Sequence, residues 1–187
     1  MTLGRVLYVG GARSGKSQAA ERRLAHLEAT YIATSAVDSS DPDWENRVRQ
    51  HRVRRPTQWR TIETLDLPTA VANATTEQPV LIDCLTLWLS RTMDDHLNWS
   101  STGKTDDLAP VERAIDDLAT ALSHAAGSVV VVSNEVGSGI VPEFPSGRLF
   151  RDLLGSCNAR VAAQCDEVNL VVAGCVLPIK PQRNRHT

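Results

Sequence analysis

A glycine-rich loop between a predicted strand and a predicted helix is the feature that most constrains the fold. The loop is the run GGARSGKS from Gly10 to Ser17, and it follows the apolar segment VLYV and precedes helix-prone residues. Phosphate-binding loops need this order, because glycine lets the backbone approach an anion and the next helix points its first N–H groups at phosphate oxygens. Lys16 is expected to reach the β- and γ-phosphates, and Ser17 to ligate Mg²⁺. The sequence therefore predicts a site for a nucleoside triphosphate.

The composition is that of a single globular domain, which we expect to span residues 1–187. The chain is 42% hydrophobic and 22% charged, with a net charge of −2, so no general field favours nucleic acid or an acidic membrane. No segment is long enough to cross a bilayer, and the first apolar run is too short for a signal peptide. The basic run from Lys180 to His186 is interpreted as a frayed terminus.

The cysteine spacing matches no metal-binding pattern and contains no C-x-x-C pair. We interpret the thiols as reduced and mostly buried, in a cytoplasmic protein. They are Cys84, Cys157, Cys165 and Cys175.

Short apolar runs alternate with helical patterns, which predicts an α/β fold with a mainly parallel sheet and helices on both faces. The predicted strands are Arg5–Val9, Thr30–Thr34, Pro79–Asp83, Ser128–Ser133 and Asn169–Ala173. The predicted helices are Lys16–Leu27, Asp41–Arg54, Leu65–Asn73, Leu85–Asp95, Ala109–Ala125 and Ser146–Cys165. Leu97–Asp107 is polar and is expected to be a surface loop.

Ligands bind at the carboxyl ends of the strands in such sheets, so residues at other strand ends are candidates for the same site. Asp83 ends an apolar strand and is expected to contact Mg²⁺, directly or through water. It could instead cap the helix beginning at Leu85. The sequence NEVGSGIVPE also follows a strand. There, Gly137 and Gly139 permit tight backbone geometry. Glu135 could contact the metal, a water or a ribose, but a structural turn is the preferred interpretation.

A segment dense in arginine, RVRQHRVRRPTQWRTIE, runs from Arg47 to Glu63 with His51 near its middle. Guanidinium groups match phosphate by planar, bidentate geometry, so the segment could be an anion-binding patch around a reactive imidazole. A solvated helix face would have the same composition. Composition alone leaves these two interpretations open.

Four blocks in this order resemble the CobU/CobP family of bifunctional adenosylcobinamide kinases and adenosylcobinamide-phosphate guanylyltransferases. They are GGARSGKS, YIATS, QHR…RP…WRT-x-E and NEVGSGIVP, and they extend over essentially the whole chain. The resemblance implies a RecA-like P-loop NTPase fold, a corrinoid substrate and a homotrimer. It implies two reactions, with ATP and GTP as substrates and Mg²⁺ as cofactor: phosphorylation of adenosylcobinamide, then transfer of GMP through a guanylylated histidine.

The resemblance also assigns site residues. The guanylylated histidine aligns with His51, and Lys16 is the second catalytic residue. The nucleotide-binding residues it implies are Gly10, Gly11, Ala12, Arg13, Ser14, Gly15, Lys16, Ser17, Ala33, Thr34, Ser35, Arg52, Val53, Arg54, Arg55, Glu63 and Asp83, with Ser17 and Asp83 at the metal.

The chain departs from the family pattern at three positions. Gln50 replaces the first of two histidines, Arg54 replaces glycine, and Asp83 replaces a glutamate that is one methylene longer. Two alternatives remain open: a P-loop small-molecule kinase without histidine chemistry, and a nucleotide-dependent switch that acts through partners.

Overall fold

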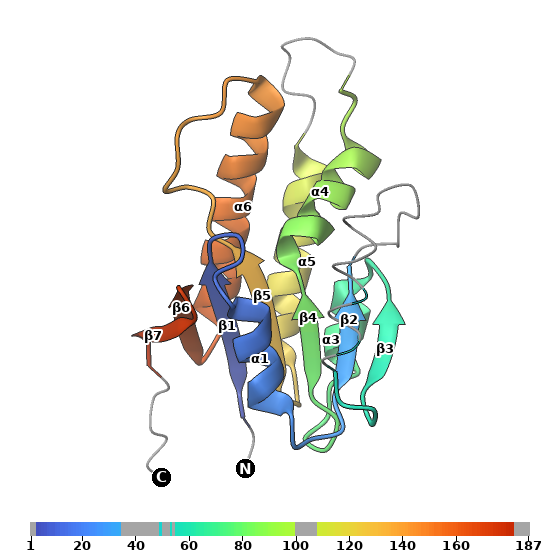
Figure 1. Cartoon of the computed structure of the whole chain (residues 1–187). Coiled ribbons are helices and arrows are strands. Elements are labelled where there is room, and N and C mark those ends of the chain that lie inside the picture. The colour runs from blue at the N-terminus through green and yellow to red at the C-terminus, as the bar shows by residue number, and fades with distance from the viewer. Residues whose placement is uncertain (1–2, 35–48, 50–52, 54, 100–107, 182–187) are drawn as a thin grey trace.

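The computed structural model describes residues 3–34, 49, 53, 55–99 and 108–181. These residues form one seven-stranded sheet with the strand order β3-β2-β4-β5-β1-β6-β7 (Figure 1). Every pairing is parallel except that of β6 with β7. The predicted α/β class and mainly parallel sheet are therefore confirmed.

All five predicted strands are present, with ends displaced by one or two residues. The strands are β1 (Arg5–Gly10), β2 (Thr30–Ala33), β3 (Arg60–Glu63), β4 (Val80–Asp83), β5 (Val129–Asn134), β6 (Glu167–Val172) and β7 (Cys175–Lys180). The central strands are apolar on consecutive positions because both of their faces are covered.

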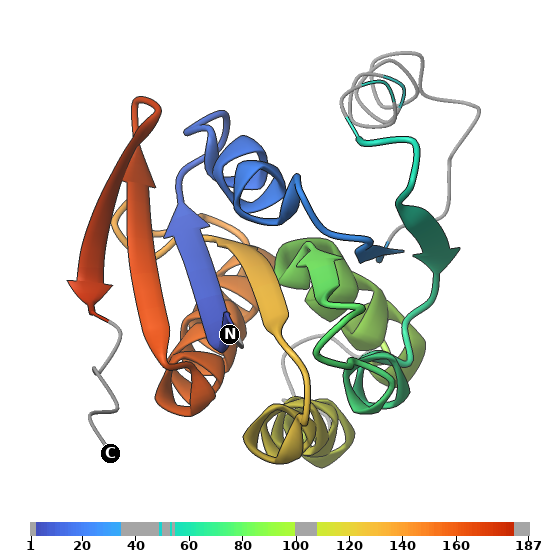
Figure 2. The same ribbon diagram turned by 90° about the horizontal axis from the view of Figure 1, so that it is seen from below.

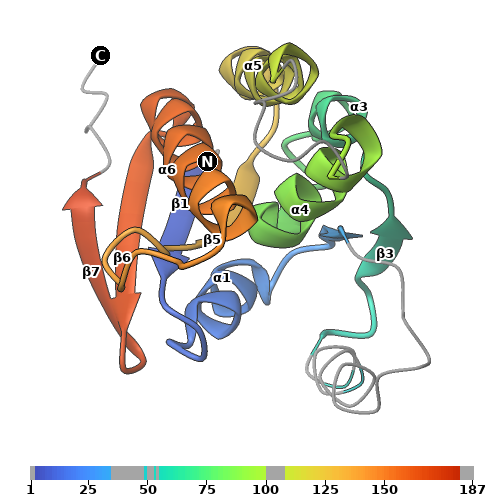
Figure 3. The ribbon, with the colours of Figure 1, turned by 90° about the horizontal axis from the view of Figure 1, so that it is seen from above.

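The helices lie on both faces of the sheet, as predicted. They are α1 (Lys16–Leu24), α3 (Leu67–Ala72), α4 (Leu85–His96), α5 (Ala109–His124) and α6 (Pro145–Gln164). Figures 2 and 3 show α1 on one face and the other four helices on the opposite face. Within the described residues, no helix has both the length and the apolar character needed to cross a membrane.

The core has two parts, one on each side of the sheet. Alternate residues of β1 enter opposite parts: Val6 and Tyr8 pack under α1, whereas Leu7 and Val9 pack against α3 to α6. This alternation follows from the two-residue period of a strand. Both faces of the sheet are therefore covered, and the glycine-rich loop follows the carboxyl end of β1.

Two edge strands were not predicted, β3 and β7. β3 has no apolar run, and β7 contains Pro178, which is tolerated only at an edge or an irregularity. Lys180 was wrongly assigned to a frayed tail: it ends β7, and its Nζ donates a hydrogen bond to the carbonyl oxygen of Ala162 at 2.9 Å.

The other expectations have mixed outcomes. Of the predicted helix Asp41–Arg54, only Arg49 and Val53 are described, and both are helical. All four cysteines are free, but only Cys157 and Cys165 are buried, while Cys84 is half-buried and Cys175 is exposed. The expectation of mostly buried thiols is therefore only half correct.

Candidate functional site

The glycine loop joins β1 to α1 in the strand–loop–helix context that the sequence predicts. Gly15 has a φ of 94° and stands at the N-cap of α1, a left-handed conformation that suits glycine. A Cβ on Gly10 would lie 2.3 Å from the carbonyl oxygen of Val171. The loop therefore requires glycine at Gly10 for space and at Gly15 for backbone conformation.

The turn between β6 and β7 supports this loop from outside. Ala173 and Gly174 both have positive φ, as the two central residues of a tight hairpin turn do. The N–H of Gly174 donates a hydrogen bond to the carbonyl oxygen of Ser14 at 2.8 Å. The unpredicted β7 hairpin thus helps to hold the phosphate-binding loop in shape.

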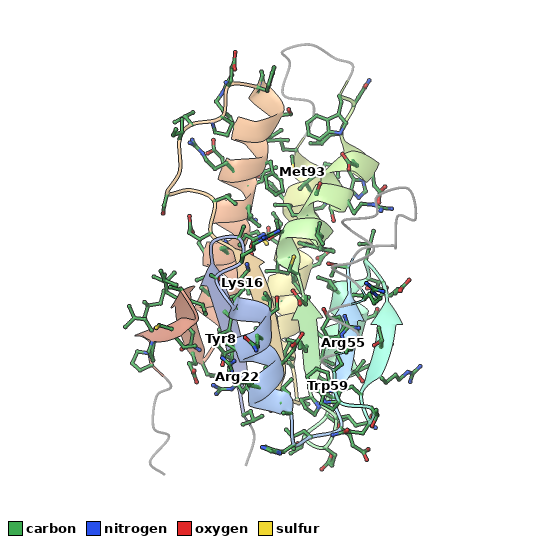
Figure 4. The ribbon with its side chains drawn as sticks, in the orientation of Figure 1. Tyr8, Lys16, Arg22, Arg55, Trp59 and Met93 are labelled. Carbon is green, nitrogen blue, oxygen red and sulfur yellow. The ribbon has the colours of Figure 1, made fainter. Side chains whose placement is uncertain are left out.

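Lys16 begins α1 and lies mostly buried at the loop (Figure 4). Its Nζ donates a hydrogen bond to the carbonyl oxygen of Gly11 at 3.0 Å. Burial lowers the pKa of this ammonium, and the nearby Cys84 and Asp83 oppose that shift. The ammonium of Lys16 has lost part of its hydration, so a negatively charged triphosphate bound at the loop would replace the contacts with water that it has lost.

Asp83 ends β4, and its carboxylate faces the first turn of α1. Ser17 Oγ donates to Asp83 Oδ1 at 3.3 Å, and Tyr31 Oη donates to Asp83 Oδ2 at 2.9 Å. The N-cap of α4 is Cys84, which makes no side-chain cap hydrogen bond. Capping is therefore not the role of Asp83. The two residues expected at the metal, Ser17 and Asp83, lie within hydrogen-bond distance of each other.

The carboxyl ends of three strands meet beside this pair. Ala33 stands opposite Asp83 on one side and opposite Glu63 on the other. The hydroxyl of Thr34 donates to the carbonyl oxygen of Cys84 and accepts from its N–H. These two bonds join the end of β2 to the residue after β4, and they use the hydroxyl of Thr34. The predicted contact of Thr34 with the nucleotide stays a prediction.

Of the arginine-rich segment, the structure describes residues 49, 53 and 55–63. Arg55 lies with its Cζ 3.3 Å from the centroid of the Tyr31 ring and donates to Thr61 Oγ1 at 3.2 Å. Val53 is 80% exposed. The predicted site residues Ser35, His51, Arg52 and Arg54 lie outside the described residues.

The end of β5 forms a turn next to the phosphate loop. The N–H of Glu135 donates to the carbonyl oxygen of Gly10 at 3.0 Å, and the Glu135 carboxylate accepts from the N–H of Gly137 at 2.6 Å. Neither Gly137 nor Gly139 has a positive φ. The Glu135 carboxylate therefore closes a turn, which agrees with the preferred interpretation.

The oxygen donors at this edge fit a magnesium ion. Mg²⁺ is usually held by one or two protein oxygens together with substrate phosphates and waters, and Ser17 Oγ and Asp83 provide such oxygens next to the loop. Among the residues the structure describes, no group of three or more His, Cys, Asp or Glu gathers into a metal site. We expect Ser17 and Asp83 to hold Mg²⁺ together with the triphosphate.

Sequence reasoning missed Tyr31 as a member of the site. Tyr31 is a polar aromatic residue in the short strand TYIA, and its hydroxyl reaches Asp83 only because β2 pairs with β4. One feature of the sequence could have identified it: Tyr31 precedes Ala33 by two residues, so the two side chains point to the same face of a strand that ends at the site.

Comparison with known proteins identifies the family. The family model of cobinamide kinase / cobinamide phosphate guanyltransferase matches residues 6–179. The chain belongs to this family. It is 41% identical over 186 residues to the bifunctional adenosylcobalamin biosynthesis protein CobU of Salmonella typhimurium, with 94% of this chain and 99% of that protein covered. It is 36% identical over 183 residues to CobP of Pseudomonas aeruginosa, with 94% of this chain and 97% of that protein covered.

Two solved structures of ATPases share the arrangement of helices and strands of this chain. An ATPase from a bacterial type III secretion system matches with a TM-score of 0.57 and 12% identity, and the ATPase EscN of enteropathogenic E. coli matches with a TM-score of 0.53 and 12% identity. They cover 90% and 91% of this chain, which spans only 51% and 43% of theirs. At this identity the likeness concerns the fold alone.

Proposed function

We propose that this member of the family catalyses two successive transfers at one nucleotide site. In the first, the terminal hydroxyl of the aminopropanol arm of adenosylcobinamide takes the γ-phosphoryl group of a nucleoside triphosphate. In the second, GMP passes from GTP through His51 to adenosylcobinamide phosphate, which gives adenosylcobinamide-GDP. Family membership over residues 6–179, together with the pairing of Ser17 and Asp83 beside the glycine loop, carries this proposal.

The first transfer needs positioning and charge stabilisation, not a covalent protein group. The glycine loop supplies backbone N–H groups, and Lys16 supplies a buried cation at its end. Mg²⁺ held by Ser17 and Asp83 would neutralise phosphate charge. The oxygen of the substrate hydroxyl bonds to the γ-phosphorus and its proton passes to solvent. The bond from the γ-phosphorus to the bridging oxygen breaks, and the nucleoside diphosphate leaves with that electron pair.

The second transfer uses the imidazole as a nucleophile. A neutral imidazole is available near pH 7 because its unperturbed pKa is about 6.5. One ring nitrogen of His51 bonds to the α-phosphorus of GTP, and pyrophosphate leaves with the electron pair of the broken P–O bond. A phosphate oxygen of the cobinamide phosphate then attacks this phosphorus, the P–N bond breaks, and the free imidazole returns. Arginines such as Arg55 would stabilise the charge on the group in transfer.

A label on the α-phosphate of GTP tests the covalent step. The protein is incubated with α-³²P-GTP and Mg²⁺, denatured, and treated with acid or alkali. We expect a protein-bound label that is labile in acid and stable in alkali, and no label in His51→Ala, because no other residue forms the phosphoramidate. Phosphorylation of adenosylcobinamide should persist in His51→Ala, since that step needs no histidine.

His124→Ala is the matched control, because His124 is exposed on α5, across the sheet from α1, and should label normally. A label that persists in His51→Ala would refute the assignment of the nucleophile. Kinase turnover with no label in the unsubstituted protein would favour a simple kinase, and nucleotide hydrolysis without either transfer would favour a switch.

We further propose that the chain assembles as a homotrimer in the cytoplasm and that its second substrate is a corrinoid. The family resemblance supports both. Large apolar side chains exposed on the single chain, such as Ile140 and Phe144 beside the start of α6, provide surface that either a neighbouring copy or the corrinoid could cover.

A further inference from the structure

Tyr31 occupies a buried position on the face of the sheet that α1 covers. It is 3% exposed and stands opposite Leu81 in the pairing of β2 with β4, two residues before the pair formed by Ala33 and Asp83. Side chains two residues apart on a strand point to the same face, so Tyr31 and Asp83 share this face at the carboxyl edge. The phenol therefore lies directly beneath the site.

The Tyr31 hydroxyl helps to fix the orientation of the Asp83 carboxylate. It donates to Oδ2 at 2.9 Å, while Ser17 Oγ donates to Oδ1 at 3.3 Å. Each carboxylate oxygen thus has its own donor, one from β2 and one from α1. A carboxylate held at both oxygens presents its remaining lone pairs in fixed directions, which is how a hydrogen-bonded neighbour tunes a metal ligand.

The guanidinium group of Arg55 stacks on the ring of Tyr31. The Cζ of Arg55 lies 3.3 Å from the ring centroid, and Nη1 of Arg55 donates to Thr61 Oγ1 on β3 at 3.2 Å. An arginine stacked on a buried aromatic face is held by the ring quadrupole and by its own planarity. Figure 4 shows Arg55 on the β2 and β3 side of the molecule and Lys16 at the loop end of α1. Arg55 is four residues from His51 in the chain.

We propose that Tyr31 is a positioning residue for both Asp83 and Arg55. Its hydroxyl orients Asp83 for the metal-bound triphosphate, and its ring holds Arg55, which belongs to the arginine-rich segment. The proposal rests on the proposed function, because it assigns Asp83 to the metal and the arginine segment to guanylyl transfer. The two contacts belong to different atoms of one side chain, so substitutions can separate them.

Tyr31→Phe removes only the hydroxyl and keeps the ring. We expect it to raise the Mg²⁺ concentration that half-saturates binding of a fluorescent, non-hydrolysable GTP analogue by about 10-fold, within the range of about 10- to 100-fold seen when a partner of a metal ligand is lost. Tyr8→Phe is the matched control. Tyr8 is the only other tyrosine of the chain, is also buried, and lies on β1 beside Arg23. An equal Mg²⁺ requirement in the two variants would overturn the proposal.

A double-substitution cycle with Asp83→Asn tests whether the effect passes through Asp83. If the hydroxyl acts only by orienting the carboxylate, Tyr31→Phe adds little to the Mg²⁺ requirement of Asp83→Asn. A full, additive 10-fold shift in the double variant would show that the hydroxyl acts by another route and would overturn the proposal. Because the readout is binding of an analogue, it stays informative even if the unsubstituted protein takes no label from GTP, an outcome that defeats the proposed function alone.

The ring contact predicts a different pattern for guanylylation. At saturating Mg²⁺, Tyr31→Leu, which removes the platform for Arg55, should label His51 about fivefold more slowly than Tyr31→Phe, which keeps the ring. Thermal unfolding measures whether Tyr31→Leu is folded, and Arg55→Gln replaces it if it is not. Equal rates in the phenylalanine variant and in the variant that loses the stacking would overturn the assignment of the ring.

Discussion

Gly10 leaves no room for a side chain where β1 turns into the phosphate-binding loop. A Cβ there would lie 2.3 Å from the carbonyl oxygen of Val171 and 2.8 Å from Ser14 Oγ. We expect Gly10→Ala to destabilise the fold by about 1 to 3 kcal/mol, the usual cost of inserting a methyl group into a packed site. Since the loop must move away from β6, nucleotide affinity should fall as well. Urea unfolding and titration with a fluorescent nucleotide measure the two effects.

Gly155→Ala is the control for Gly10→Ala. Gly155 lies inside α6, and a Cβ there would meet nothing within 4 Å. Alanine in a helix interior is favoured over glycine by about 0.5 to 1 kcal/mol, so this variant should gain stability and bind nucleotide normally. Equal losses in both variants would show that the close approach of Val171 to Gly10 does not set the requirement for glycine.

At the scale of residues, the sequence predicts those parts of the site that are local in the chain. Gly10, Lys16 and Ser17 follow from one short motif, and the loop has the predicted context. Tyr31 and its bond to Asp83 could not be predicted, because the two residues are 52 positions apart and meet only through the pairing of β2 with β4. Spacing along the chain does not give strand order.

At the scale of elements, a bidentate ion pair attaches α1 to the sheet. Nη1 and Nη2 of Arg23 donate to Oε1 and Oε2 of Glu167 on β6 at 3.0 and 2.8 Å, with side chains 21% and 14% exposed. We expect Arg23→Gln to destabilise the protein by about 2 kcal/mol, because the mostly buried carboxylate of Glu167 loses its cation and keeps only the neutral hydrogen bond from Asn169. The midpoint of urea unfolding measures the loss, and α1 should lose protection from hydrogen exchange first.

Arg22→Gln is the matched control, since Arg22 is the exposed neighbour of Arg23 in the same last turn of α1. Its effect should stay within about 0.5 kcal/mol, as for most surface substitutions. The double variant Arg23→Gln with Glu167→Gln should recover part of the stability, because no buried charge is then left unpaired. A double variant that loses the sum of the two single effects would contradict this account.

The elements that the sequence predicts are those with a clear period or a buried apolar run. α5 follows from Val111, Ile115, Leu118 and Leu122, and all four are fully buried. β3 and β7 could not be predicted in the same way, because edge strands carry polar or irregular patterns and are defined by their neighbours. The turn at Ala173 and Gly174 also lacks the usual Asn-Gly or Asp-Gly signal.

At the scale of the whole molecule, we expect buried acidic side chains to make the stability of the fold sensitive to alkali, and two cysteines to contribute to this effect. Cys157 of α6 and Cys165 at its C-cap are buried against the face of the sheet that carries α3 to α6. Burial raises the pKa of each thiol from 9.0 to about 12, because a thiolate there would lose its hydration. In the unfolded chain the thiols regain their ordinary pKa. Folding therefore keeps protons on both thiols over a range of pH in which the unfolded chain releases them.

The free energy of unfolding should consequently fall as the pH rises from 9 towards 12. In this window the unfolded state binds fewer protons than the folded state, so the slope is negative and reaches at most about 1.4 kcal/mol per pH unit for each thiol. Cys157→Ala should unfold in less urea at pH 8, because it loses packing, yet its stability should decline less steeply above pH 9. Cys175→Ala removes an exposed thiol on β7 and should keep the steep decline. If the two variants lose stability with the same slope between pH 9 and 11, burial of the α6 thiol does not cause the alkaline sensitivity.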